Sequence, residues 1–140
     1  MLEISQNLKE KIIAYARAGA PYEACGLLGG QLEGAGVAHH RVAQTFYPMT
    51  NVDQSPVHYT LDPTEQFKIM KQMREKGEEL MGIFHSHVAS PARPSAEDVR
   101  LAHYPGVSYV LVSLAEDPAP FKSYVIEGGN ITEEIVRLIG

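Results

Sequence analysis

Apolar residues recur at helical spacing in two long stretches of the chain. In residues 5–18 the apolar positions fall three or four apart, at Leu8, Ile12 and Tyr15, and polar residues fill the positions between them. The second stretch starts at Asp62-Pro63-Thr64-Glu65, where an N-cap, a proline at the first helical position and an acid favour helix initiation. It ends at Gly77, and we expect it to direct Phe67, Met70 and Met73 inward. A third, shorter helix is predicted over residues 96–103.

Shorter apolar runs between these helices predict strands. We expect them at the end of residues 21–30 and over residues 37–48, 57–60, 80–84, 109–114 and 121–126. The run 109–114 is apolar enough for a central strand that is buried on both faces. Residues 131–139 fit an edge strand or a helix, and their Ile and Val content favours the strand. This order of elements predicts an α/β domain with a mixed β-sheet and flanking helices.

Size and composition restrict the class of protein. The chain has 140 residues, 44% of them hydrophobic, which predicts one domain over residues 1–140. The net charge is −5, and no run of Lys or Arg offers a stripe for nucleic acid. No apolar run is long enough to cross a bilayer, which argues against a membrane partner. Cys25 is the single cysteine, and residues 1–15 lack the apolar core of a signal peptide, so we expect a cytoplasmic protein without an internal disulfide.

A candidate metal site follows the apolar run at residues 80–84. Residues two apart on a strand share a face, so His85 and His87 are expected to point the same way. Ser95-Ala96-Glu97-Asp98 has the S-x-x-D form of a helix start, which places Ser95 at the N-cap and Asp98 one turn in, able to reach the histidines. Two imidazoles and one carboxylate form a three-ligand set for zinc with an open fourth position, as in catalytic sites.

Other interpretations of these polar residues stay open. A histidine near a strand end is commonly hydrogen-bonded or exposed, and S-x-x-D starts many helices without a metal. Of His39 and His40, which would face opposite sides of a strand, at most one could join the site, and surface positions are favoured for both. Glu23 on its own would be a solvated surface group. Cys25 as a thiol nucleophile is disfavoured, because its neighbours are typical of a small buried hydrophobic residue.

The complete pattern is much more specific than its parts. H-x-H, seven residues, Ser, two residues and Asp resembles the signature of the JAMM metalloproteases, also called the MPN-plus family. That family also has a glutamate ahead of a strand similar to Cys25-Gly26-Leu27-Leu28-Gly29, and Glu23 stands in this place. The resemblance implies a fold similar to that of cytidine deaminases. It also implies zinc ligands at His85, His87 and Asp98, a general acid and base at Glu23, and a residue at Ser95 that stabilises the tetrahedral intermediate.

The resemblance also implies an activity. JAMM proteins of this kind are zinc-dependent hydrolases that cleave amide or isopeptide bonds at the C-terminal tails of ubiquitin-like proteins. This chain is similar to the compact bacterial and archaeal members, several of which act on sulfur-carrier proteins of cysteine, thiamine or molybdopterin pathways. Two alternatives are a non-catalytic MPN interaction scaffold and a relative associated with DNA repair. A second copy of the chain, in a homodimer, stays open as a partner, and no motif names the substrate.

Overall fold

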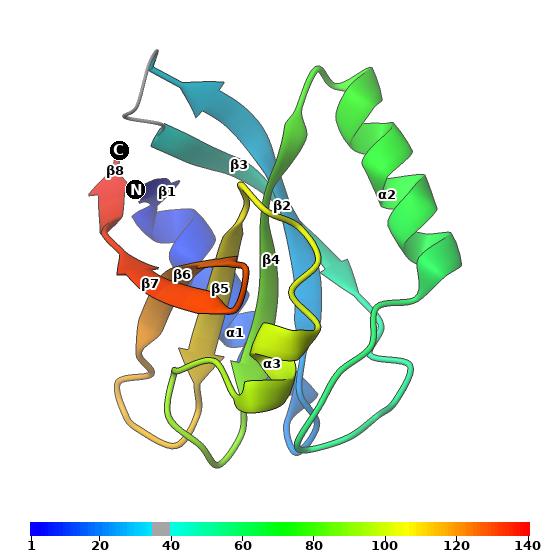
Figure 1. The fold of residues 1–140 in the computed structure, drawn as a ribbon, viewed down its shortest axis with the longest axis vertical. Coiled ribbons are helices and arrows are strands. Elements are labelled where there is room, and N and C mark those ends of the chain that lie inside the picture. Colours follow the sequence, from blue (N-terminus) through cyan, green and yellow to red (C-terminus); the bar gives the residue numbers. More distant parts are fainter. Residues whose placement is uncertain (35–39) are drawn as a thin grey trace.

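The structure, a computed structural model, describes residues 1–34 and 40–140, in which helices are interspersed among the strands (Figure 1). The helices are α1 (Gln6–Gly19), α2 (Pro63–Glu75) and α3 (Ala96–Arg100). The strands are β1 (Leu2–Ser5), β2 (Cys25–Glu33), β3 (His40–Met49), β4 (Glu79–His87), β5 (Ser108–Ser113), β6 (Phe121–Glu127), β7 (Asn130–Glu134) and β8 (Val136–Ile139). The predicted α/β class is confirmed.

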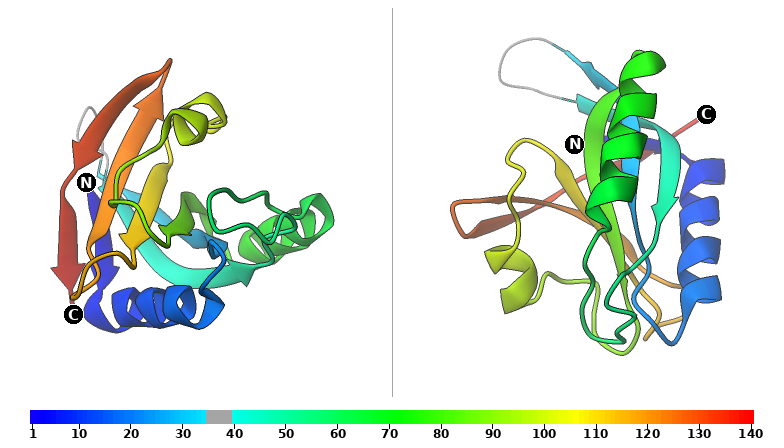
Figure 2. Two further views of the ribbon diagram at one scale, coloured as in Figure 1. Left: turned by 90° about the horizontal axis from the view of Figure 1, so that it is seen from below. Right: turned by 90° about the vertical axis from the view of Figure 1, so that its right-hand side faces the viewer.

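The eight strands form one mixed sheet in the order β7-β6-β5-β4-β2-β3-β1-β8. β4 pairs parallel with β5, and β1 pairs parallel with β3 and β8, whereas the other neighbours are antiparallel. β7 and β8 stand at opposite ends of this order, although Ile135 alone separates them in the chain. The sheet therefore curls until its two edges approach each other, which both views of Figure 2 show.

Helices cover the two faces of the sheet separately. α1 packs on one face, where its buried residues Ile12 and Ala16 join a cluster with Leu28 and Phe84. α2 and the segment around α3 lie on the other face (Figure 2). There the core contains Cys25, Leu27, Tyr47, Met49, Ile69, Met73, Ile83, Tyr109 and Leu111. The alternation of side chains along β2 and β4 thus divides the core into two layers.

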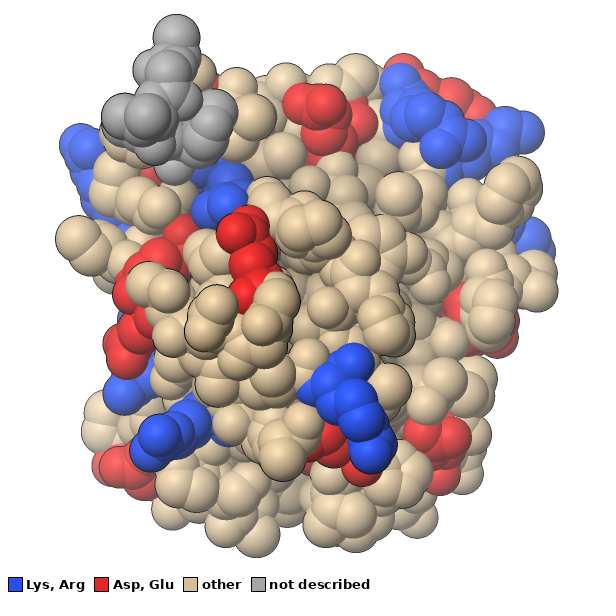
Figure 3. Space-filling model, in the orientation of Figure 1, with Lys and Arg blue, Asp and Glu red and all other residues tan. Residues whose placement is uncertain are grey.

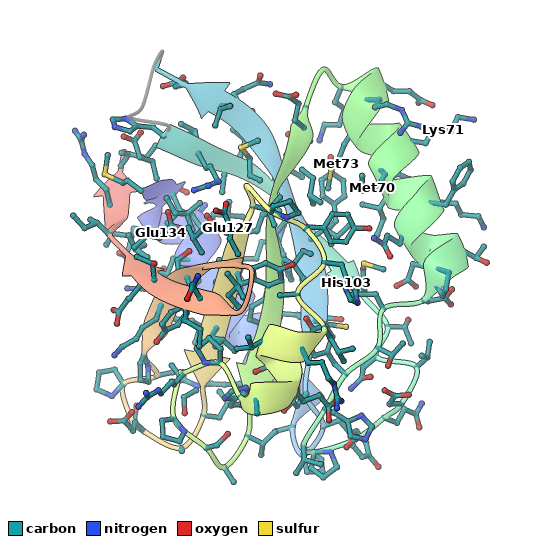
Figure 4. All side chains as sticks on the ribbon, in the orientation of Figure 1. Met70, Lys71, Met73, His103, Glu127 and Glu134 are labelled. Carbon is teal, nitrogen blue, oxygen red and sulfur yellow. The ribbon has the colours of Figure 1, made fainter. Side chains whose placement is uncertain are left out.

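The inward face of α2 differs from the prediction at one position. Met73 is buried and Met70 is partly buried, and both point from α2 towards the sheet, whereas Lys71 points away (Figure 4). Phe67 is 68% exposed, so its predicted inward position was wrong. Ile69 and Met73, four residues apart, set the buried stripe, and Phe67 lies about 200° around the helix from Ile69.

Four further features differ from the predictions. Residues 57–60 form a loop where a strand was predicted. Their backbone groups at His58 and Thr60 bond to the Asn51 side chain and not to a neighbouring strand. β1 was not predicted, although Leu2 and Ile4 alternate and are fully buried. α3 ends at Arg100, three residues earlier than expected. Residues 131–139 are extended as favoured, but as two strands, β7 and β8. No helix in the described ranges has the length and hydropathy to cross a membrane.

Candidate metal centre

His85 and His87 lie at the end of β4 with their side chains on one face of the sheet. Their Nε2 atoms are 3.3 Å apart, and both rings are almost completely buried. The Oδ2 atom of Asp98 lies 3.1 Å from each of these nitrogens. Asp98 follows His87 by 11 positions and His85 by 13, and the three side chains converge on one point, as the sequence spacing predicted.

The first turn of α3 holds the Asp98 carboxylate in this place. Ser95 is the N-cap, and its Oγ accepts a hydrogen bond of 3.0 Å from the backbone N–H of Asp98. In return, the backbone N–H of Ser95 donates to Oδ2 of Asp98 at 2.8 Å, which completes a capping box. The predicted helix start is confirmed, and it fixes the same carboxylate oxygen that faces the histidines.

These three side chains fit the demands of a tetrahedral metal ion. Bonds of about 2.0–2.2 Å to nitrogen and oxygen require ligand atoms about 3.3–3.5 Å apart at tetrahedral angles. The three separations here, 3.1, 3.1 and 3.3 Å, are close to that requirement. Two imidazoles with one carboxylate are also a donor set that zinc accepts. The fit supports the prediction that His85, His87 and Asp98 could hold a metal.

The charge states of His85 and Asp98 suit a cation, whereas a metal at His87 would have to displace a proton. Burial lowers the pKa of His85 and favours the neutral imidazole that a metal requires. Burial alone would lower the pKa of His87, but the hydrogen bonds to Asp98 and to the Pro91 carbonyl, together with the negative charges of Asp98 and Glu23, raise it. Burial alone would raise the pKa of Asp98, but hydrogen bonds from the two histidines hold it well below its usual range. The site therefore contains an ionised carboxylate.

Different contacts orient the two rings. Nδ1 of His87 lies 2.7 Å from the carbonyl oxygen of Pro91, so an N–H there would leave the Nε2 lone pair free for a metal. Nδ1 of His85 is buried without a hydrogen-bond partner in the described part of the chain. The ring of Tyr59 stacks on His85 instead, with centroids 4.4 Å apart and planes 23° from parallel. Sequence patterns gave no indication of Tyr59, because it lies in a loop without a motif.

Glu23 lies just ahead of β2, beside the end of β4. In the antiparallel β2–β4 pair, Cys25 stands opposite His85, so Glu23 and His87 fall at the same end of the sheet. The residue is 4% exposed, which contradicts a solvated surface position. Burial raises its pKa to about 7, with His87 lowering the pKa and Asp98 and Glu97 raising it. A carboxyl with this pKa can both accept and release a proton near neutral pH.

A cavity of about 620 Å³ opens directly beside Asp98. It lies between the loop before α2 and the segment that follows α3, where Figure 4 labels His103. Glu97 and Asp98 are among the residues that line it, and Figure 3 shows charged side chains of both signs on this face of the molecule. The cavity is lined by Tyr59, Thr60, Leu61, Gln66, Ile83, Glu97, Asp98, Leu101, His103, Tyr104 and Tyr109. Apart from Asp98, sequence reasoning identified none of these as site residues, because no spacing marks them.

The other candidates lie outside the centre. Nδ1 of His40 is 3.5 Å from a carboxylate oxygen of Glu3 at the far end of β3, and His39 lies outside the described residues. The Cys25 thiol is buried, and burial raises its pKa to about 12. Both observations disfavour a thiolate nucleophile at Cys25, as the sequence does.

Known proteins are similar to this chain in sequence and in fold. Residues 5–127 match the family model described as prokaryotic homologs of the JAB domain. The chain is 40% identical over 141 residues to the CysO-cysteine peptidase of Mycobacterium tuberculosis, which covers 99% of this chain and 92% of the peptidase. It is 32% identical over 112 residues to the probable TtuB-protein conjugate cleaving protease of Thermus thermophilus, covering 79% of this chain and 69% of the protease.

A solved structure extends the similarity to three dimensions. A protein from Desulfitobacterium hafniense, determined in solution, superposes with a TM-score of 0.89 at 44% identity. The match covers 99% of this chain and 93% of that protein. Since the family model spans most of the chain and the resemblance rests on the same metal-ligand spacing, this chain belongs to the prokaryotic JAB-domain proteins of the JAMM type.

Proposed function

We propose that this chain is a zinc-dependent peptidase that cleaves an amide or isopeptide bond at the C-terminal tail of a ubiquitin-like protein, with sulfur-carrier proteins included. The observation that carries the proposal is the meeting of three ligand atoms, 3.1–3.3 Å apart, with a buried glutamate whose pKa is raised to about 7. Such a group beside a three-ligand metal site is typical of metal-assisted hydrolysis.

The roles of the side chains follow from their chemistry. When bound, zinc would supply Lewis-acid activation of a water molecule and of the scissile carbonyl. Glu23 accepts a proton from the attacking water at its carboxylate and later returns it to the nitrogen of the leaving amine. The Ser95 hydroxyl oxygen accepts a hydrogen bond from the backbone N–H of Asp98. The hydroxyl proton of Ser95 is therefore free to donate to the developing oxyanion.

The cavity beside Asp98 is the place that we propose for the tail. The C-terminal tail of a ubiquitin-like protein is a narrow extended peptide, and a groove about 620 Å³ in volume with aromatic walls suits such a chain. Gln66 donates a hydrogen bond of 2.9 Å to the Tyr104 hydroxyl and so joins α2 to the segment after α3. The walls of the groove are thereby held together while the tail lies between them.

The names of the relatives guide the choice of leaving group. The CysO-cysteine peptidase matches nearly the whole chain at 40% identity, and the protease named for TtuB-protein conjugates matches less of it at 32%. We therefore propose that a carrier protein with a C-terminal amino-acid adduct is the preferred substrate over a protein conjugate. Both substrates contain an amide nitrogen that Glu23 would protonate as the bond breaks.

Mass spectrometry of candidate substrates tests this function. The zinc-loaded protein is incubated with a ubiquitin-like sulfur carrier that bears a C-terminal cysteine adduct and, separately, with the same carrier joined to a lysine side chain. We expect the adduct mass to disappear first and the conjugate to react more slowly. Zinc-loaded, folded protein that leaves both substrates intact would favour the alternative of a non-catalytic MPN scaffold.

A further inference from the structure

The loop over residues 51–61 connects β3 to α2, and the Asn51 side chain lies at its centre. The Asn51 carboxamide Oδ1 accepts hydrogen bonds of 3.1 Å from the backbone N–H groups of Asp53 and Thr60. Its Nδ2 donates, also at 3.1 Å, to the carbonyl oxygens of Glu23 and His58. Two donated and two accepted bonds use the full hydrogen-bonding capacity of one carboxamide.

This loop holds Glu23 by both of its backbone groups. The N–H of Glu23 donates to the carbonyl oxygen of Ser55 at 2.8 Å, and its carbonyl oxygen accepts from Asn51. The next residue, Ala24, is bound to Ser86 through a 2.8 Å bond to the Ser86 hydroxyl and a 3.0 Å bond between the backbones. The buried Glu23 is therefore fixed between the loop on one side and β4 on the other.

The same asparagine also holds the ring that orients a metal ligand. Its bonds to His58 and Thr60 grip the residues immediately before and after Tyr59. Tyr59 in turn stacks on His85, whose Nδ1 has no hydrogen-bond partner among the described residues. Metal-binding histidines are ordinarily oriented by a hydrogen bond from the second ring nitrogen, so the stacked ring takes over that task here.

We infer that Asn51 is a positioning residue that fixes Glu23 and His85 relative to each other. Its one carboxamide holds the Glu23 backbone and the two neighbours of Tyr59. The inference rests on the proposed function for the role of Glu23, but its consequence for His85 concerns metal binding alone. Loss of the carboxamide should loosen the general acid and one metal ligand together. A residue that only stabilised the loop would affect neither in the folded molecule.

The test uses two substitutions and one matched control. Asn51→Ala removes all four bonds, whereas Asn51→Asp keeps the acceptors for Asp53 and Thr60 and replaces the donors to Glu23 and His58 by a charged carboxylate oxygen. Val57→Ala lies in the same loop with a side chain that is 77% exposed, so it serves as the control. For each protein we would measure zinc affinity against a chelating dye, kcat and KM on the carrier adduct, and cooperative unfolding.

The outcomes separate positioning from general stability. Substitution of groups that orient metal ligands typically costs about 10–100-fold in affinity or activity, and we expect such losses in zinc affinity and in kcat for both Asn51 variants while unfolding stays cooperative. The control should match the parent. Parental zinc affinity and kcat in folded Asn51→Asp would overturn the inference, as would failure of both variants to fold. If the parent binds zinc but cleaves no substrate, the proposed function fails, and zinc affinity alone still decides the role of Asn51 towards His85.

Discussion

The Glu23 carboxyl populates both its protonated and its ionised form near neutral pH, because burial raises its pKa to about 7. Glu23→Gln keeps the size of the side chain and removes its basicity. We expect the variant to fold and to bind zinc as the parent does, since Glu23 is not among the three converging ligand atoms. Its kcat should fall by about 10²–10⁴-fold with little change in KM, as is typical for a general acid and base.

Kinetics and metal content of this one variant decide the role of Glu23. Turnover close to that of the parent would remove Glu23 from the reaction. Loss of zinc from the folded variant would instead make the residue a ligand.

Asp98 and Ser95 have different tasks within one capping box. Asp98→Ala removes one of the three ligand atoms, and we expect it to lose zinc. Ser95→Ala removes only the hydroxyl, because the backbone N–H that binds Asp98 stays in place. It should retain zinc, lose about 1 kcal/mol of stability with the cap, and turn over more slowly. Metal analysis after gel filtration checks both, and equal zinc loss in the two variants would contradict these assignments.

At the level of elements, the close pairing of β2 with β3 depends on a glycine. A Cβ at Gly30 would lie 1.8 Å from the carbonyl oxygen of Val42, so Gly30→Ala must move one strand. We expect a loss of about 3 kcal/mol or more in the free energy of unfolding, measured in urea. Gly19→Ala is the matched control, because its Cβ would meet only the Ala24 Cβ at 3.4 Å. A Gly30 variant as stable as this control would show that the strands are not packed this closely.

The sequence predicts the elements best where a pattern is long and local. The helical spacing in α1, the N-cap of α2 and the apolar run of β4 are each complete within one segment, so these elements were predicted correctly. The four residues of β1 are too few for a pattern, and the loop at residues 57–60 has the composition of a strand. In that loop the decisive contact comes from Asn51, which lies outside the segment.

The residues of the candidate site also differ in how far a local sequence pattern predicts them. His85, His87, Ser95 and Asp98 lie within 14 consecutive positions, and strand alternation together with a capping box is enough to bring them together. Glu23 came from the family resemblance, since nothing local marks a glutamate that becomes buried only when β2 pairs with β4. Tyr59, Asn51 and the walls of the cavity depend on tertiary contacts, and no sequence pattern identifies them.

For the whole molecule, Glu134 joins the two ends of the curled sheet. From β7 its carboxylate accepts hydrogen bonds of 2.5 Å from Ser108 and 2.7 Å from Ser123, and it lies 3.2 Å from Arg41 of β3. Burial alone would raise the pKa of Glu134, but the hydrogen bonds from Ser108, Ser123 and the Met1 ammonium group, together with the charge of that group, lower the pKa. A lowered pKa stabilises the fold above the unfolded value of about 4.3, and this contribution is lost as pH falls through the folded value.

This linkage predicts the acid behaviour of Glu134→Gln. The variant should be less stable than the parent at pH 7, by on the order of 2 kcal/mol, because it loses charge-assisted bonds. The difference should shrink steadily below about pH 4, where the parent loses the same contribution. Urea unfolding of both proteins from pH 7 to pH 3 measures it. A constant difference across this range would mean that the carboxylate charge plays no part.

We expect cleavage to need one metal ion held by His85, His87 and Asp98. The most direct measurement is the rate of adduct cleavage, read by mass, while zinc is added back to metal-free protein. We expect no cleavage without metal and a linear rise in rate that levels off at about one zinc per chain, as three converging ligand atoms imply. Full cleavage by the metal-free protein, or none after one equivalent of zinc is bound, would contradict this expectation.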